Sequence, residues 1–223
     1  MKFVGVIGRL LAAGLLISGC QTTGNDSSNS VVMKAPTQAA PKIKVVAVPL
    51  PNVQVGDTWS YSDGYGLKVG AIKADGNTRY ERTDVEDQWL VRKAFFKQES
   101  QSRKTHRLVV FRTLDPMELI SSSINTPISY IREYMRNDEL IRHRTTWVIE
   151  GKERITVPAG TFDTWVMVMR TESLTSNWRG YERWYYSPEV NNYVRLEYKY
   201  GDAPDGSRVL MSYALVSNEK PKS

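Results

Sequence analysis

The stretch 145-TTWVIEGKERITVPAGTFDTWVMVMRT-171 decides the fold of this chain. β-Branched and aromatic residues, which favour strands, fill both sides of a central Val157-Pro158-Ala159-Gly160. Proline presets φ at the second position of a β-turn and glycine suits the fourth, so these residues predict a tight turn between two strands. Pro158 and Gly160 are therefore predicted to be structural turn residues. The first strand, residues 145–157, is expected to bend at Gly151.

Further strands are predicted on both sides of this hairpin. Downstream, residues 179–186, 193–201 and 208–216 favour strands, and apolar and charged side chains alternate along 193–201. Upstream, turn signals such as Asp63-Gly64 and Asp75-Gly76 recur about every dozen residues, a spacing typical of an antiparallel meander. Strands do not alternate with long helices, so a parallel doubly wound sheet is not expected.

One segment is predicted to be helical. Ile128, Ile131, Tyr134 and Met135 lie at near-helical spacing, and Thr126-Pro127 resembles a helix start. We expect a helix over residues 127–137 that covers one end or one open face of the sheet. The sequence thus predicts a mainly β fold, a single curved antiparallel sheet or half-open barrel with one short helix.

The N-terminus has the features of a bacterial signal peptide. Lys2 and Arg9 supply positive charge, and residues 10–17 form an apolar run too short to span a bilayer. The run ends in Leu16-Ile17-Ser18-Gly19-Cys20, which resembles the lipobox of bacterial lipoproteins. The resemblance implies cleavage before Cys20 and its modification with diacylglyceryl and palmitate-type acyl chains. Two or three such chains anchor a protein firmly to a membrane.

The resemblance also predicts where the protein resides. Gln21 rather than aspartate follows the cysteine, which in the lipoproteins of an enteric-type Gram-negative cell implies the outer membrane, facing the periplasm. We expect a signal peptide over residues 1–19, a flexible tether over 20–52, a β-rich domain over 53–217 and a tail over 218–223. No cysteine remains after Cys20, so the domain must fold without a disulfide.

The charge balance is mild. Cleavage removes two of the 30 basic side chains and none of the 24 acidic ones, so the net charge falls from +6 to +4. Such a surface suits anionic lipid headgroups or acidic glycans, but ordinary solubility explains it better. No basic run is dense enough to predict nucleic-acid binding.

A second resemblance concerns the β-rich part. The segments 157-VPAGTF-162, 182-ERWYYSPEV-190 and 194-VRLE-197 resemble a group of bacterial exported β-rich domains of unknown function, whose signature is V-P-A-G-x-F followed by W-Y-x-P-x-V. The segment 56-GDTW-59 is similar to the usual start of such a domain. The resemblance implies a strongly curved antiparallel sheet and structural roles for the motif residues. It implies no reaction.

Catalytic and metal-binding patterns do not emerge from the sequence. His106 and His143 are far apart and lie among basic residues, so no metal site and no cofactor are predicted. Glu150 and Glu153 could pair as acid and base for glycoside hydrolysis, but charged residues on the wet face of a sheet explain them better.

Aromatic residues crowd the second half of the chain and are the candidate ligand contacts. Both faces of the strands there carry rings, so a face must be covered by the helix, by a partner or by a ligand. The alternatives are a covered core, an apolar groove for a lipid or acyl chain, and a stacking platform for glycan. The tentative ligand-binding residues are Trp165, Trp178, Trp184 and Tyr186, with Arg170, Arg179 and Arg183 available for an anionic headgroup or sugar.

Two functions remain open at this point. The first is a non-enzymatic, membrane-anchored lipoprotein that binds or scaffolds an envelope component such as lipid, glycan or protein. The alternative is an envelope hydrolase that acts on glycan or peptide. A deep apolar cavity would favour the first, and two convergent carboxylates in a cleft would favour the second.

Overall fold

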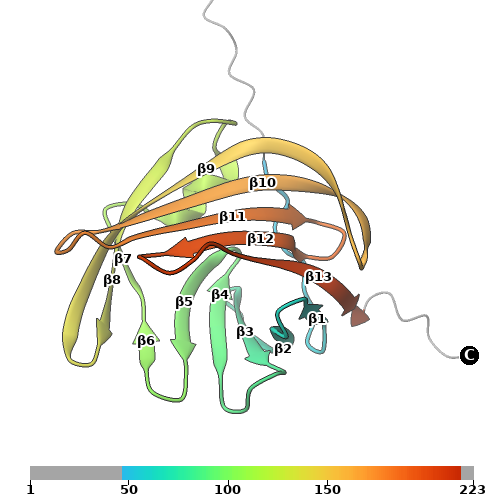
Figure 1. The fold of residues 1–223 in the computed structure, drawn as a ribbon, viewed down its shortest axis with the longest axis horizontal. Helices are drawn as coiled ribbons and strands as arrows, with labels where there is room; N and C mark the ends of the chain where they lie inside the picture. Colours follow the sequence, from blue (N-terminus) through green and yellow to red (C-terminus); the bar gives the residue numbers. More distant parts are fainter. Residues whose placement is uncertain (1–46, 217–223) are drawn as a thin grey trace, which may run out of the picture. The chain divides into compact units, whose positions relative to one another are not determined.

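The structure, a computed structural model, describes residues 47–216. These residues form one sheet of thirteen strands and one short 3₁₀ helix (Figure 1). In chain order the elements are β1 (Thr58–Tyr61), β2 (Gly66–Ile72), β3 (Asn77–Arg82), β4 (Trp89–Lys93), β5 (Phe96–Gln101), β6 (His106–Leu108), β7 (Val110–Arg112), η1 (Pro116–Ser121), β8 (Ile128–Arg136), β9 (Glu139–Val157), β10 (Gly160–Ser173), β11 (Arg179–Ser187), β12 (Asn192–Tyr200) and β13 (Gly206–Ala214).

The sheet curls until its two edges nearly meet. Its strand order is β6-β5-β4-β3-β2-β1-β13-β12-β11-β10-β9-β8-β7, and all neighbouring strands are antiparallel. The edge strands β6 and β7 are consecutive in the chain and separated only by Val109. Figure 1 shows the long strands β9 to β12 arching over the shorter β3 to β6. The predicted mainly β fold, a curved antiparallel sheet close to a half-open barrel, is confirmed.

The hairpin that the sequence singles out joins the two longest strands. Val157 pairs with Gly160, so Pro158-Ala159 form a two-residue loop between β9 and β10. Gly160 has φ +141°, a conformation that residues with a Cβ rarely adopt. At the expected bend, Gly151 has φ +146° and the register shifts by one residue between Val166 and Met167. This β-bulge helps a long strand to curve around the barrel.

The predicted helix over residues 127–137 is wrong. This segment is strand β8, which pairs with β9 from Ile128 opposite Trp147 to Arg136 opposite Glu139. Asn137 and Asp138 both have positive φ and form the turn between the two strands. The helix lies earlier, at η1, where the side chain of Asp115 caps the first turn by accepting from the Met117 N–H.

The sheet covers its own inner face. Rings from the early strands contact rings from the late ones: Phe95 packs edge-on against Tyr186 at 4.8 Å and Phe96 against Trp147 at 5.7 Å between centroids. The sequence had assigned the cover of one end or one open face to a helix over residues 127–137, which is strand β8 instead. The short helix η1 places Leu119 in the core, where it is 1% exposed.

Motif residues far apart in the sequence meet in the core. The Trp59 indole N–H donates to the Val190 carbonyl at 2.7 Å, and the Tyr61 hydroxyl donates to the Tyr193 carbonyl at 3.0 Å. The buried Asp57 carboxylate accepts from the Val216 N–H at 2.8 Å. These bonds tie β1 and the residue before it to the β11–β12 connection, to β12 and to the last residue described. The structural role expected of these residues agrees with this arrangement.

The folded part begins before the predicted domain start at residue 53. Val48, which the sequence assigned to the tether, is 2% exposed and its N–H donates to the Ile120 carbonyl at 3.2 Å. Asn52 exchanges two hydrogen bonds with the Asn191 side chain, each 3.0 Å long. Cys20, the signal peptide, most of the tether and the tail 218–223 lie outside the described residues. Within residues 47–216, no helix has the length and apolarity needed to cross a bilayer.

Candidate functional site

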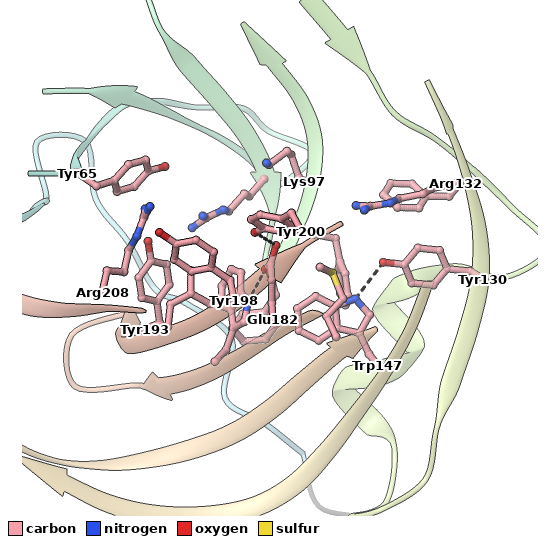
Figure 2. A pocket seen from close by; sticks show the side chains of 17 residues that line it. Tyr65, Lys97, Tyr130, Arg132, Trp147, Glu182, Tyr193, Tyr198, Tyr200 and Arg208 are labelled. Atoms are coloured by element: carbon pink, nitrogen blue, oxygen red, sulfur yellow. Dashed lines mark hydrogen bonds between the residues drawn. The ribbon is translucent and has the colours of Figure 1, made fainter. Parts of the chain in front are cut away.

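The inner face of the sheet encloses a cavity of about 200 Å³. It adjoins a wider vestibule of about 740 Å³, lined chiefly by β5, β8, β9 and the β10–β11 connection. Four residues line both spaces: Lys97, Arg132, Glu182 and Tyr200. They come from β5, β8, β11 and β12 and converge because the sheet closes (Figure 2).

Basic side chains dominate the polar lining. Arg92, Lys97, Arg132 and Arg208 line the inner cavity, and Arg107 lines the vestibule. Arg208 pairs with Asp63 at 2.8 Å. Within residues 47–216, the other four have no carboxylate oxygen within 4.0 Å. The positive charge of the cavity is therefore largely uncompensated by the described residues.

Aromatic rings lie against two of these arginines, of which Arg208 also has the Asp63 carboxylate as a partner. The Arg92 guanidinium lies 5.2 Å from the Trp184 ring centroid, and that of Arg208 lies 4.0 Å from the Tyr65 centroid. Cation–π contacts of this kind position a guanidinium without neutralising it. Deep in the core, the Trp147 indole N–H donates to the Tyr130 hydroxyl at 3.1 Å (Figure 2). The wall is thus preorganised and still carries its charge.

Glu182 is the one carboxylate among the residues that line the inner cavity. It accepts a hydrogen bond from the Tyr200 hydroxyl and another from the Trp184 indole N–H at 2.7 Å. Burial, and then the Glu182 charge, raise the pKa of Tyr200, so this hydroxyl stays a donor. No basic nitrogen among the described residues lies within 4.0 Å of Glu182.

Two pKa values report the electrostatics of the site. The pKa of Lys97 is lowered to about 8, mainly because the surrounding wall removes water, with Arg92, Arg132 and Arg107 adding repulsion and Glu182 opposing them. The Lys97 side chain lines the vestibule and is exposed, so solvent still reaches its ammonium. The pKa of His143 is lowered to about 4 by burial first and by neighbouring arginines second. Both groups lie where an added positive charge is disfavoured.

The structure separates the four candidate aromatic residues. Trp184 lines the inner cavity, and Trp178 lines the vestibule, where its ring stacks on His143 at 4.8 Å. Tyr186 is fully buried, and Trp165 is 5% exposed with the Lys152 ammonium 4.4 Å from its ring centroid. Neither of these two lines the cavity or the vestibule. Ligand contact remains a prediction for all four.

The charged residues that the sequence suggested lie elsewhere. Arg183 pairs with Glu150 at 2.9 Å, and neither lines the cavity. Arg170 and Arg179 are exposed and line a separate surface depression. The cations that do face the cavity went unnoticed because they carry no motif. The one available signal was a basic residue at an otherwise apolar strand position, as at Arg92.

The described residues contain no candidate metal-binding cluster. Residues 47–216 hold no group of three or more histidine, cysteine, aspartate or glutamate side chains that could bind an ion. The His143 ring packs between the rings of Tyr134 and Trp178. The exposed His106 forms a hydrogen bond with Glu99, with 2.6 Å between Nε2 and Oε1. The expectation of no metal and no cofactor stays a prediction.

Comparisons with known proteins find likeness only at the level of structure. No protein-family model and no curated protein sequence matches the chain. The hypothetical lipoprotein YmcC from Escherichia coli K12 matches with a TM-score of 0.50 and 10% identity, over 72% of this chain and 85% of that one. This likeness shows a shared fold.

Two further solved structures resemble the chain more weakly. A provisionally named lipoprotein from Parabacteroides distasonis gives a TM-score of 0.37 with 16% identity, over 72% of this chain and 96% of that one. A provisionally named exported protein with a YmcC-like fold from Bacteroides fragilis gives 0.41 with 12% identity, over 76% and 100%.

Proposed function

We propose that this protein is a membrane-anchored lipoprotein of the cell envelope that binds an anionic envelope component in the cationic cavity and does not change it chemically. One observation carries the binding role. Arg92, Lys97, Arg107 and Arg132 line the inner cavity or the adjoining vestibule, and no described carboxylate lies within 4.0 Å of any of them.

An anion is the ligand that this arrangement favours. Partly buried cations lose hydration, and they repel one another unless a counter-charge is present. The Nε–H groups of Arg107 and Arg132 are buried without a hydrogen-bond partner in the described structure. A bound oxyanion would supply both the acceptors and the charge. Charge in a low-dielectric cleft also steers an anionic ligand towards it.

A purely apolar ligand fits the inner cavity poorly. The inner cavity holds about 200 Å³, and charged residues line it. The deep apolar cavity that would favour an acyl ligand is not what residues 47–216 form.

The hydrolase alternative gains no support from this site. Glycosidases need two carboxyl groups about 5–9.5 Å apart. Glu182 is the single carboxylate lining the inner cavity, and its oxygens already accept two hydrogen bonds. Glu150 is paired with Arg183, and Glu153 does not line the cavity.

The lipid anchor rests on Leu16-Ile17-Ser18-Gly19-Cys20, and the fold likeness to a hypothetical lipoprotein agrees with it. Metabolic labelling with radioactive palmitate in an enteric Gram-negative host tests it. We expect label in the wild-type chain and none in Cys20→Ala. As a matched control, Gln21→Asp should keep the label and move the protein from the outer to the inner membrane. Label in Cys20→Ala would refute the anchor.

Native mass spectrometry of the detergent-extracted protein tests the binding role. We expect a co-purifying anionic molecule on the wild type and its loss from Lys97→Met/Arg132→Met. Arg170→Met, which removes an exposed charge outside the cavity, should retain it. A ligand that is neutral, or that survives the double substitution, would contradict the proposed function.

A further inference from the structure

The cavity and the vestibule meet at a junction made by Lys97, Arg132, Glu182 and Tyr200 (Figure 2). We use the word junction for these four residues. All four border both spaces. Two of the four are cations, and one is a carboxylate that no described cation neutralises within 4.0 Å. The junction therefore presents two opposite chemical demands side by side.

The cationic half requires an oxyanion. Arg132 makes only one long hydrogen bond, 3.5 Å from its Nη2 to the Thr171 hydroxyl, and its Nε–H is buried without a partner. Lys97 faces the same space and has no described carboxylate partner. Carboxylate, phosphate and sulfate groups accept such charge-assisted bonds. Arg107 adds a third cation on the vestibule side.

The acidic half requires hydroxyl donors. A carboxylate can accept about four hydrogen bonds, and Glu182 receives two from the described residues, from the Tyr200 hydroxyl and the Trp184 indole N–H. An oxyanion brought against the remaining lone pairs would be repelled. Hydroxyl groups of a ligand would satisfy them instead. The two halves together call for one ligand that carries both an anionic group and hydroxyl groups.

The geometry points to a hydroxylated unit that bears an oxyanion, with the oxyanion at Lys97 and Arg132 and at least one hydroxyl donating to Glu182. This inference rests on the proposed function and narrows its ligand class. An acidic sugar of an envelope glycan has this chemistry, and so does the hydroxylated headgroup of an anionic lipid. The inner cavity of about 200 Å³ suits a group of the size of one sugar or headgroup.

Matched probes test the inference by calorimetry on the mature, detergent-solubilised chain. Galactarate and adipate are both six-carbon dicarboxylates, and only galactarate carries hydroxyl groups. We expect galactarate to bind the wild type roughly tenfold or more tightly than adipate, since a hydrogen bond to a charged group is typically worth at least this factor. Phosphatidylglycerol and phosphatidate in mixed micelles make the same comparison for a lipid source, because phosphatidate lacks the headgroup hydroxyls.

Glu182→Gln tests the contribution of the carboxylate independently of the two cations of the junction. The substitution removes the charge and keeps one carbonyl oxygen, which can accept from the Trp184 indole N–H while the new NH2 group donates to the Tyr200 hydroxyl oxygen. We expect it to abolish the preference for galactarate over adipate, while inorganic phosphate binds as well as before or better. Glu150→Gln, which removes a carboxylate outside the cavity, should leave every affinity unchanged.

The outcomes distinguish the inference from the proposed function. Equal affinity of the wild type for galactarate and adipate, and for the two lipids, would overturn the inference and leave anion binding intact. This comparison needs no variant, so it holds even if Glu182→Gln fails to fold. Failure of every anionic probe to bind, or binding unaffected by Lys97→Met and Arg132→Met, would overturn the proposed function itself. A preference seen only with the lipid pair, or only with the soluble pair, would support the inference and identify the source.

Discussion

Replacing Gly160 by alanine should destabilise the protein through the backbone of the central hairpin. Gly160 has φ +141°, and a Cβ at this position would lie 3.2 Å from Cζ of Phe162, which is 3% exposed. Holding a residue with a Cβ in such a conformation costs of the order of 1–3 kcal/mol. Crowding against a buried ring adds to this cost because a packed core yields little.

Gly151 offers a matched comparison. It has φ +146°, but nothing lies within 4 Å of an added Cβ. Gly151→Ala should therefore show the backbone cost alone, and Gly160→Ala should show at least as large a loss. For a domain of this size, a loss of about 2 kcal/mol lowers the melting temperature by about 4–8 °C.

Thermal and urea unfolding of the mature chain, followed by circular dichroism, would measure both losses. Asp163→Ala serves as a surface control, because its side chain is 80% exposed and pairs only loosely with Arg154 at 3.7 Å. Its effect should stay within about 0.5 kcal/mol. The expected fall in melting temperature is about 4–8 °C. If Gly160→Ala melts within about 1 °C of the wild type, the strain assigned to this position is wrong. Gly160→Val should be worse than alanine for the same reason.

Three further predictions concern His143, Lys97 and Trp59. Because the folded-state pKa of His143 is lowered to about 4, the unfolded chain takes up the proton first, so stability should fall between about pH 6.5 and pH 4, and His143→Phe should flatten this dependence of the melting temperature. Because the pKa of Lys97 is lowered to about 8, the protein should become more stable as pH rises from about 8 to 10.4. Lys97→Met should remove this pH dependence, and its persistence in the variant would show that another group causes it. Trp59→Phe should cost about 2–4 kcal/mol, because it leaves the buried Val190 carbonyl without its donor and opens a void. A urea-unfolding loss below 1 kcal/mol would contradict that role for the indole N–H.

Local sequence signals predicted much of the sheet and failed where they were ambiguous. The Pro158-Ala159 turn, the bend at Gly151 and the alternation along β12 follow from residue chemistry within a few positions, so they could be read in advance. Residues 127–137 contain apolar spacing compatible with a helix, but also the β-branched and aromatic residues of a strand. Pairing with β9 decides between the two, and this partner is a tertiary fact. The Asn137-Asp138 turn was the overlooked local signal.

By itself, the sequence determined the fold class, the central hairpin and the predicted lipid anchor, because each depends on residues that are neighbours in the chain. Only the tertiary structure decided the candidate site. Lys97, Arg132, Glu182 and Tyr200 lie on four different strands, and none belongs to a motif that announces a ligand. They face one another because the sheet curls until its edges nearly meet, and closure turns scattered inward positions into one charged wall. Spatial convergence of this kind depends on the register and curvature of the whole sheet, which no local pattern encodes.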